Sequence, residues 1–510
     1  MTSAPDNIQE IPRLTPARRR AILLTLTVTI ATYVLTVTVA NVSLSQLQGS
    51  FAATQDQITW VVTSNLLATA IATPLSGWLN SHFGRRRVML WSAALFALAS
   101  AACGMAGGLG ELVIYRAIQG AAGAPLLPIG QAIILQIYPK AEHGRVFVIW
   151  SIGVTLGSII APILGGYAAE DYGWRWVFLM VVPFAVACVI AIWVYIDESD
   201  EMASGLPFDW SGFFFLAIAV SALQLMLDRG ERHDWFGSTE IVLEAITAAV
   251  AFYLFIVHVL TTNRPFLNPR LLLDRNYAVG IMLAFVFGML YFTTLVLQPT
   301  MLQDLRGYPN SMVGILQASR GVGLLAGSLL VLIFLQKLDP RLTIMLGFLL
   351  QGMAGYAMAG FNVNMTTSAV AWTTMLQGFG IGLIWSPITV VTFATLAPRH
   401  MAEGASVFHL LRNIGSSVHI AISAALVVRS GRAAYSEIIE VLNPFNERLN
   451  YDSVTGAWNA SSPAGLAQLS AEVGRQASMI GYVNAYYAYA IAAMLIMPLV
   501  FLAKRPRPAD

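Results

Sequence analysis

Charge is what this chain lacks most. Only 11% of its 510 residues are Asp, Glu, Lys or Arg, and 57% are hydrophobic, whereas soluble domains carry about 25% charged residues. A chain with so little charge cannot cover a surface that faces water. The composition therefore excludes an ordinary soluble protein and predicts an integral membrane protein.

Cysteine and the usual signatures of catalysis are scarce as well. The two cysteines, Cys103 and Cys188, lie in apolar runs, which favours small core residues over a disulfide framework. The sequence has no P-loop, zinc-ligand spacing or nucleophile pattern, so we predict no enzyme, cofactor or metal, and no nucleic-acid partner. We expect no cleavable signal, because Arg18 to Arg20 lead into an uncharged run from 21 to 55, too long for one.

What the chain does have is a series of apolar runs, each long enough for the roughly 20 residues of a membrane-spanning helix. Counting these runs and their interruptions predicts fourteen spans. The run from 342 to 398 is divided at the polar segment FNVNMTTS, which makes that boundary the least certain. The expected spans are 21–42, 57–79, 88–108, 112–137, 146–168, 176–196, 210–227, 241–260, 277–302, 312–336, 342–361, 369–396, 404–428 and 479–503.

The basic residues of the connections predict the orientation, because cytoplasmic loops hold an excess of Lys and Arg. With a cytoplasmic N-terminus, 18 lysines and arginines fall on the cytoplasmic side and 8 on the other. The acidic connection DESDEMASGLPFD breaks the trend, but acidic residues have little weight in this rule. We therefore expect both termini in the cytoplasm.

Two segments of the chain resemble each other. RAIQGAAGAPLLP (116–128) aligns with TMLQGFGIGLIWSP (374–387), so that Gln119 matches Gln377 and Gly120 matches Gly378, 258 residues later. The same offset carries Gly157 to Gly415. Duplicated halves are the common plan of secondary transporters, although chance similarity between glycine-rich apolar segments is the alternative.

The stretch GVTLGSIIAPILGG (153–166) holds its glycines inside 24 residues without a charge. Irregular backbone does not face lipid at that depth, and no GKS or GKT follows, so a loop and a phosphate site are excluded. The remaining interpretation is a helix with small residues on one face, which lets another helix pack closely, and with a proline that permits a bend. The residues concerned are Gly153, Gly157, Ala161, Pro162, Gly165 and Gly166.

Three motifs carry a family resemblance. The small-residue stretch resembles the span-five antiporter signature of the major facilitator superfamily, with Ala161 where glycine is usual. The connection GWLNSHFGRRR (77–87) resembles the loop motif of that superfamily, and RAIQG (116–120) its arginine-bearing span-four motif. The matching residues are Gly77, Gly84, Arg85 and Arg86 in the loop, and Arg116, Gln119 and Gly120 in span four.

The segments LQLMLDRGERHDWFGSTEI, WRWVFLMVVP and NPFN resemble the fourteen-span drug:proton antiporter branch, and within it the EmrB-type exporters. The resemblance implies an all-α membrane protein with two six-helix bundles and two inserted helices. It implies a multidrug exporter of the inner membrane, driven by the proton gradient, that moves hydrophobic or amphipathic compounds and confers antibiotic resistance. It also implies a periplasmic membrane-fusion adaptor and a TolC-type outer-membrane channel as partners. Export of one anionic or lipid-like metabolite is the first alternative, and a non-transporting scaffold the second.

The expected organisation follows from these spans. Residues 429–477 between the last two spans are too few for a domain with its own core. We interpret them as a periplasmic loop with at most one short helix, either a spacer or a docking surface. The segments are a tail (1–20), a first bundle (21–200), inserted helices (205–262), a second bundle (270–503) and a tail (504–510).

The chain departs from the family at the residue that would carry a proton. Thr36 stands where an Asp is expected in the first span, although Asn41 is kept, and Ser81 replaces the acid of the loop motif. A hydroxyl does not titrate near neutral pH. The proton site of relatives therefore cannot be transferred to this chain.

Ionisable residues inside spans mark functional sites by default. Arg116 and Arg320 lie within spans four and ten. Arg116 belongs either among the gating groups or to structural pairing with backbone carbonyls. Arg320 indicates a pocket for an anionic head group or a permanent counter-charge, unless the span boundary is misplaced.

Span thirteen carries a polar stripe. His409, Arg412 and His419 fall with two serines within an arc of about 80° on a helical projection. Because histidine titrates near neutral pH, His409 or His419 is a candidate to relay the proton that Thr36 cannot carry. The alternative is that both line the cavity without titrating.

Overall fold

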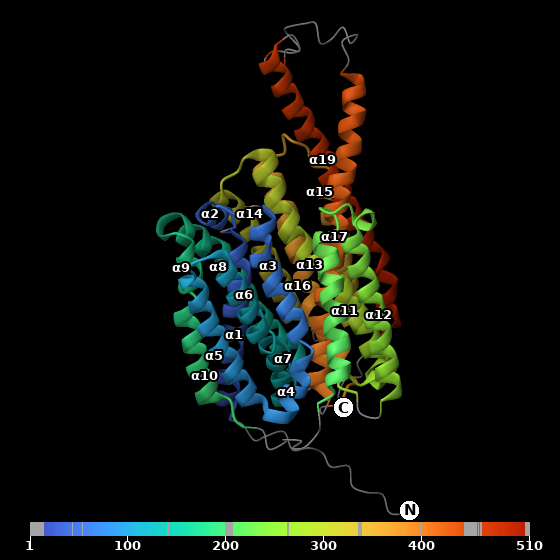
Figure 1. Cartoon of the computed structure of the whole chain (residues 1–510). Helices are drawn as coiled ribbons and strands as arrows, with labels where there is room; N and C mark the ends of the chain where they lie inside the picture. The colour runs from blue at the N-terminus through green and yellow to red at the C-terminus, as the bar shows by residue number, and fades with distance from the viewer. Residues whose placement is uncertain are drawn as a thin grey trace, which may run out of the picture.

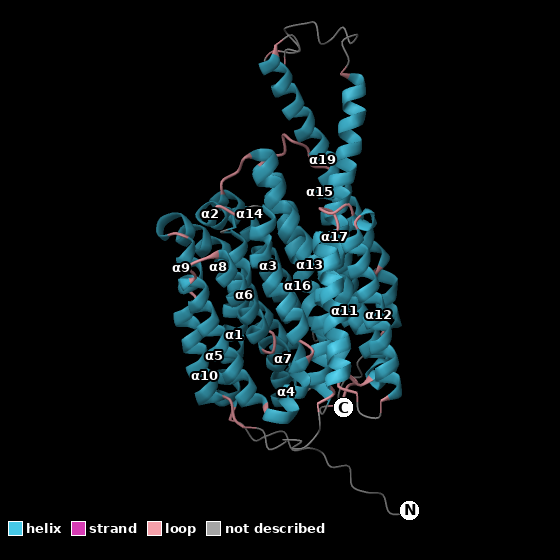
Figure 2. Cartoon of the chain, in the orientation of Figure 1, coloured by secondary structure: helices cyan, strands magenta, loops and turns pink. Residues whose placement is uncertain are grey.

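The computed structural model describes residues 15–42, 44–53, 55–139, 142–198, 208–262, 265–334, 339–397, 400–442, 456, 458 and 462–504. These residues form a bundle of long helices joined by short connections and contain no strand (Figures 1 and 2). The start of α1 and the last described residues, which follow α19 (Pro463–Leu495), lie at the same end of the bundle (Figure 1). The all-helical fold expected from the apolar runs and the family resemblance is confirmed.

The N-terminal bundle begins with a long helix and then uses several broken ones. The breaks fall at Pro74, at Pro125 and near Pro183, since proline removes a backbone donor and bends or ends a helix. Its elements are α1 (Pro16–Val42), α2 (Leu44–Phe51), α3 (Gln55–Ala72), α4 (Leu75–Phe83), α5 (Arg85–Met105), α6 (Leu109–Gly123), α7 (Leu126–Ile137), α8 (His143–Tyr167), η2 (Ala168–Tyr172), α9 (Trp174–Leu179) and α10 (Val182–Tyr195).

Two inserted helices, α11 (Trp210–Arg229) and α12 (Thr239–Thr261), pack against each other and precede the C-terminal bundle. Asp209 caps α11, accepting a 2.9 Å hydrogen bond from the Gly212 amide, and also accepts one from His258 of α12. Short 3-10 turns, η3 (Trp235–Gly237), η4 (Pro269–Leu273) and η7 (Met497–Leu502), flank these elements. The C-terminal bundle comprises α13 (Arg275–Arg306), α14 (Asn310–Phe334), α15 (Pro340–Met358), α16 (Thr367–Phe393), α17 (Met401–Val441) and α19 (Pro463–Leu495).

Each of the fourteen expected ranges contains a helix or a broken pair of helices. Among the described residues, however, twelve helical stretches are long and apolar enough to cross a membrane. α15 is not one of them, and α3 contributes only the shorter apolar stretch Trp60–Ala72. The exact count of fourteen spans is therefore not confirmed.

The resemblance between the two segments of sequence reappears as equivalent helix packing. A Cβ added at Gly120 of α6 would lie 2.3 Å from the carbonyl oxygen of Asn65 on α3, and one at Gly378 of α16 would lie 1.9 Å from that of Arg320 on α14. Gly157 of α8 meets Ala31 of α1, and its counterpart Gly415 of α17 meets Phe285 of α13. Both bundles therefore use matched glycines where their helices approach most closely.

The expected periplasmic loop at 429–477 is wrong for the described part of that range. α17 continues without a break to Val441, and α19 already begins at Pro463, so both helices project beyond the bundle as a hairpin (Figure 1). At 1.5 Å per residue, the 41 residues of α17 extend about 60 Å, twice the hydrocarbon thickness of a bilayer. Gly431 lies against the Ala477 backbone and Tyr435 against Ser470, which explains how the projecting helices support each other.

Candidate functional site

The seam between the two bundles holds the most unusual polar groups of the chain. α8 packs on α14, where a Cβ added at Gly321 would collide with Ile159, and α17 packs on α7 and α4. His409 of α17 is only 1% exposed, and its Nε2 lies 2.5 Å from Oε1 of Gln131 on α7. Because a Gln oxygen only accepts hydrogen bonds, this nitrogen donates. One hydrogen bond therefore joins residues of the two bundles inside the seam.

Arg412 lies one turn further along α17, in an aromatic surrounding. Its guanidinium carbon is 5.7 Å from the ring centre of Phe292 and 5.5 Å from that of Trp385. It donates a 3.0 Å hydrogen bond to Asn413, while its buried Nε has no partner in the described structure. A partly desolvated cation between aromatic faces suits an aromatic or anionic group of a ligand.

Arg320 lies in the interior of α14 and is 5% exposed, so the alternative of a misplaced span boundary is excluded. Its Nη2 donates a 2.5 Å hydrogen bond to the carbonyl oxygen of Tyr291 on α13, whose ring centre is 4.6 Å from the guanidinium carbon. Among the described residues it forms no ion pair, and its Nε has no partner. The positive charge of Arg320 therefore has no neutralising carboxylate among the described residues.

Sequence reasoning did not find the polar network beside Arg320. Gln377 Nε2 donates to Thr294 at 2.5 Å and to the Tyr489 hydroxyl at 2.9 Å, and that hydroxyl donates in turn to Gln351. All four side chains are fully or almost fully buried. The available signal was the repeated Gln377, since a glutamine in an uncharged span needs buried partners.

Arg116 makes the structural pairing that was its alternative interpretation. It is 1% exposed, and its Nε donates to the Val61 carbonyl at 3.1 Å. Its Nη1 donates to Gln119 at 2.5 Å, and Gln119 donates to Ser100 at 2.7 Å. The cluster ties α6 to α3 and α5 within the N-terminal bundle, and no ion pair with it is found among the residues described. Its geometry anchors helices and does not point to the seam.

His419 belongs to the C-terminal bundle alone. Its Nδ1 lies 2.7 Å from the Thr293 hydroxyl of α13 and 3.3 Å from that of Ser423. Thr293 donates its single hydrogen to the Met289 carbonyl, so the His419 nitrogen must donate. Its Nε2 is buried without a partner in the described structure. The expected stripe is therefore two separate sites, because His409 contacts α7 and His419 contacts α13.

Thr36 of the first span is bonded within its own helix. Thr36 is 2% exposed, and its hydroxyl donates to the Thr32 carbonyl at 2.8 Å within the same helix. Thr32 is bonded in the same way to Val28, so this face of α1 satisfies itself. Asn41 lies on α1, but its side chain is outside the described residues.

The antiporter-motif helix α8 makes the close approach that its glycines predict. A Cβ added at Gly153 would lie 1.9 Å from a methyl group of Thr27, one at Gly165 would lie 2.9 Å from Val39, and Ala161 is fully buried. Each of these contacts is with α1 or in the core beside it. Pro162 and Gly166 lie on α8, but their surroundings are outside what the structure describes.

The loop motif lies at the end of the bundle where α4 meets α17. A Cβ added at Gly77 would lie 3.0 Å from Cα of Glu403, and Gly84 turns the chain with a φ of 80°. Arg85 donates to Gln136 at 3.2 Å and Arg86 to the Trp193 carbonyl at 2.7 Å. Ser81, in the place of the family acid, donates to the Trp78 carbonyl. The motif therefore ties α5 to α7 and α10 and packs α4 against α17 beside the seam.

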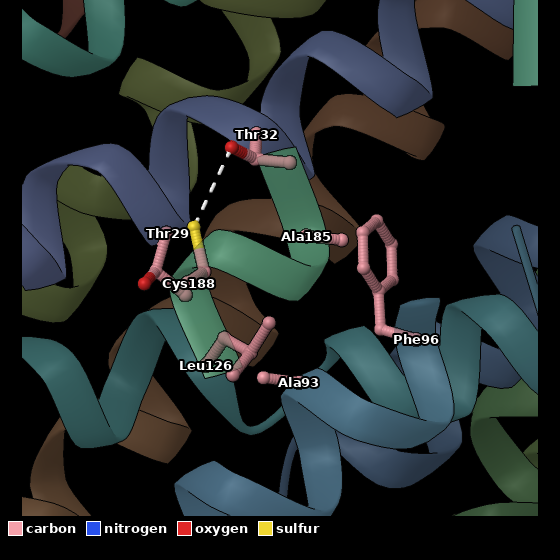
Figure 3. A pocket seen from close by; sticks show the side chains of 7 residues that line it. All are labelled: Thr29, Thr32, Ala93, Phe96, Leu126, Ala185 and Cys188. Carbon is pink, nitrogen blue, oxygen red and sulfur yellow. Dashed lines mark hydrogen bonds between the residues drawn. The ribbon is translucent and has the colours of Figure 1, made fainter. Parts of the chain in front are cut away.

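A small cavity lies inside the N-terminal bundle, apart from the seam (Figure 3). Its volume of about 10 Å³ is the size of one water molecule. The Thr29 and Thr32 hydroxyls donate to their own helix, and Cys188 lies 3.8 Å from Thr32. It is too small for a substrate. The seam is the candidate site because the buried His409 and the cation of Arg412 lie there.

Comparison with known sequences identifies the relatives of this chain. Residues 24–419 match the Major Facilitator Superfamily. The chain is 31% identical to the multidrug export protein EmrB of Escherichia coli over 95% of this chain and 96% of that protein. It is 30% identical to the fatty acid resistance protein FarB of Neisseria gonorrhoeae over 98% of both chains.

Solved structures show the same fold. The proton:xylose symporter XylE superposes with a TM-score of 0.62 at 13% identity, covering 96% of both chains. The human organic anion transporter MFSD10 (TETRAN) superposes with a TM-score of 0.59 at 12% identity, covering 94% of this chain and 100% of that one. At such identities these structures carry information on the fold alone.

Proposed function

This chain belongs to the major facilitator superfamily, and from that premise we propose that it is an EmrB-type secondary active exporter of hydrophobic or amphipathic compounds. It is a multi-pass membrane protein and a transporter, not an enzyme. The similarity to the EmrB multidrug export protein over nearly the whole length supports the substrate class. One observation carries the site: the cation of Arg412 lies against the rings of Phe292 and Trp385, one turn from the hydrogen bond of His409 that joins the two bundles.

Transport proceeds by alternating access, in which the two bundles rock about the seam and expose the site to one side at a time. The glycine contacts within each bundle keep it rigid, because small residues let helix backbones approach closely. The hydrogen bond between His409 and Gln131 crosses from one bundle to the other. It must break when the bundles separate at that depth.

Proton antiport supplies the energy, and His409 and His419 are the proposed proton carriers. Both are almost fully buried, and each has one ring nitrogen without a partner in the described structure. Protonation would place a charge on that nitrogen, so it favours the conformation in which water reaches it. Thr36 has no such role, because its hydroxyl is bonded within α1. The loop motif holds helices in position beside the seam, and Arg116 does so within the N-terminal bundle.

Export of an anionic amphipathic compound is the second candidate. Arg320 and Arg412 both lie in the membrane interior, and neither forms an ion pair within the described part of the chain. Such charges are costly in a bilayer and usually face a cavity or a ligand. The similarity to a fatty acid resistance protein is consistent with a carboxylate substrate. In this reading, the arginines bind the carboxylate and the rings of Phe292 and Trp385 contact the apolar part.

The cellular setting rests on the family. We place the protein in the inner membrane with both termini cytoplasmic, in agreement with the basic residues near those ends. A periplasmic adaptor and a TolC-type outer-membrane channel would then continue the export path. The hairpin of α17 and α19 projects from the opposite end of the bundle (Figure 1), which is the side that such an adaptor must reach.

Transport in proteoliposomes with an imposed pH gradient tests this proposal. We expect accumulation of a fluorescent hydrophobic substrate that depends on the gradient and is abolished by a protonophore. Arg412→Gln, which keeps a polar side chain, should reduce transport of carboxylate substrates more than that of neutral ones. Uptake that does not depend on the pH gradient would contradict antiport. Equal losses of transport for carboxylate and neutral substrates in Arg412→Gln would contradict export of an anionic compound.

A further inference from the structure

The inserted helix α11 lies between the two bundles and is not a peripheral addition. Leu216 and Val220 of α11 form one buried apolar cluster with Ala70 of α3 and Leu410 of α17. α3 belongs to the N-terminal bundle and α17 to the C-terminal bundle. α11 therefore closes one side of the seam that must open and close during transport.

Each bundle is hydrogen-bonded to α11, on successive turns of that helix. The Ser417 hydroxyl of α17 donates to Oε1 of Gln224 at 2.7 Å. The Thr63 hydroxyl of α3 donates to Oδ2 of Asp228. Gln224 and Asp228 are four residues apart and so share one face of α11. The same face thus holds a neutral contact to one bundle and a carboxylate contact to the other.

Asp228 forms no ion pair among the residues that the structure describes. Its charged neighbours are Arg229 and Arg232 on its own side. Arg229 is occupied by Glu240 at 2.5 Å and Glu244 at 3.4 Å, and Glu240 also faces His233 at 3.9 Å. From the described part of α3, Thr63 is the group that reaches the carboxylate. The Thr63 hydroxyl is therefore the contact that joins this carboxylate to the described part of α3.

The contacts to the C-terminal bundle are of a different kind. Beyond the bond from Ser417, Glu231 lies 3.8 Å from Arg429 of α17 and accepts a 2.7 Å hydrogen bond from Trp235. α17 thus bonds α11 at Gln224 and faces the turn that follows α11 at Glu231. Separation of the bundles at this end must break either the contacts to α17 or the contact between Thr63 and Asp228.

We propose that Asp228 is a positioning residue whose protonation releases α3 from α11 and so opens the seam on the outer side. This inference rests on the export cycle proposed above. A hydroxyl bonds a carboxylate more strongly than it bonds a neutral carboxyl group. Asp228 is in the last turn of α11, at the end of the bundle from which α17 and α19 project (Figure 1), so it meets protons of the outer compartment. An acidic exterior then favours the state that releases substrate outward.

Two variants separate the charge from the hydrogen bond. Asp228→Asn keeps an acceptor oxygen but removes the charge, and Thr63→Val removes the donor while keeping the shape. Thr63→Ser restores the donor. The matched control is Asp304→Asn, which neutralises an exposed carboxylate at the outer end of α13. Because Cys103 and Cys188 are buried, spin labels can be placed at Ser50→Cys and Gln303→Cys, two exposed positions on the outer ends of the two bundles.

The measurement is the distance between these labels, by double electron–electron resonance, at external pH values from 5 to 8. Wild type should move toward the longer distance as the pH falls. Asp228→Asn and Thr63→Val should show the longer distance at all pH values, with an open-to-closed ratio at pH 8 raised about fivefold, the effect of exchanging a charged for a neutral hydrogen bond. Thr63→Ser and Asp304→Asn should behave as wild type.

An unchanged pH response in Asp228→Asn would overturn the inference, as would a response of Asp304→Asn equal to that of Asp228→Asn. Transport assays on the same samples separate this result from the export proposal. If the label distance in wild type lengthens as the pH falls but no substrate is transported, the proposed export is wrong, while the proposed role of Asp228 is supported. If Asp228→Asn still transports substrate with a wild-type dependence on external pH, the proposed role of Asp228 is wrong, while the proposed export is supported.

Discussion

A single methyl group at Gly378 should disrupt the C-terminal bundle. A Cβ built there lies 1.9 Å from the carbonyl oxygen of Arg320 and 2.8 Å from its carbonyl carbon. Ordinary contact needs about 3.4 Å, so α16 and α14 must separate by about 1.5 Å. Both atoms belong to a helix backbone and cannot rotate away. Overpacking of this kind costs about 1–3 kcal/mol or more.

The displacement would also move Arg320 away from Tyr291 and strain the bonds of the adjacent Gln377. We therefore expect Gly378→Ala to lower the melting temperature in detergent and to reduce transport. The repeat equivalent, Gly120→Ala, meets the Asn65 carbonyl at 2.3 Å and should behave alike in the other bundle.

The control is Gly474→Ala in the projecting part of α19, where an added Cβ meets nothing within 4 Å. Alanine is favoured over glycine in a helix by about 1 kcal/mol, so this variant should be neutral or slightly more stable. Melting can be followed by the loss of monodisperse protein in fluorescence-detected size exclusion. If Gly378→Ala melts at the wild-type temperature, the close approach of α14 and α16 is refuted.

Further predictions concern the seam and the hairpin. Gln131→Leu removes the acceptor of His409 across the seam and should change the rate of transport more than substrate affinity; an altered affinity with an unchanged rate would argue against an inter-bundle contact. Thr293→Val leaves the His419 nitrogen without its nearest partner and should destabilise the protein by about 1–3 kcal/mol, measured as a fall in melting temperature that Thr293→Ser does not produce. Replacing 432–474 by a short flexible linker should leave transport in proteoliposomes intact but reduce drug resistance in cells that depend on the adaptor; equal activity in cells would assign the hairpin a spacer role.

The positions of the helices followed from the sequence because lipid imposes a simple rule. Each expected span contains a helix or a broken pair of helices, and the departures are at the span ends and at the proline breaks. The prediction of a loop at 429–477 was wrong because it used the same signal, polarity, to decide where a helix ends. Charge and polarity mark where the apolar region ends, but they do not end a helix, and α17 continues through Arg429 and Arg432 as far as Val441.

The candidate site was predicted in part. Arg320, His409, Arg412 and His419 were chosen because ionisable side chains in a span need a reason to be there, and three of them are almost fully buried. Their partners could not be read from the sequence. Gln131 is 278 residues from His409, and periodicity shows which face of a helix is polar but not which other helix covers it.

Sequence alone indicated that lipid surrounds the chain, that the chain is helical, that two segments repeat, and which glycines let helices pack closely. Each of these depends on local composition or on spacing within one helix. The tertiary structure decided which polar groups meet. It paired His409 with Gln131, enclosed Arg412 in aromatic rings and placed Asp228 against Thr63. Such pairings depend on how helices distant in the chain are arranged around one another, and the free energy that fixes them is shared across the whole bundle.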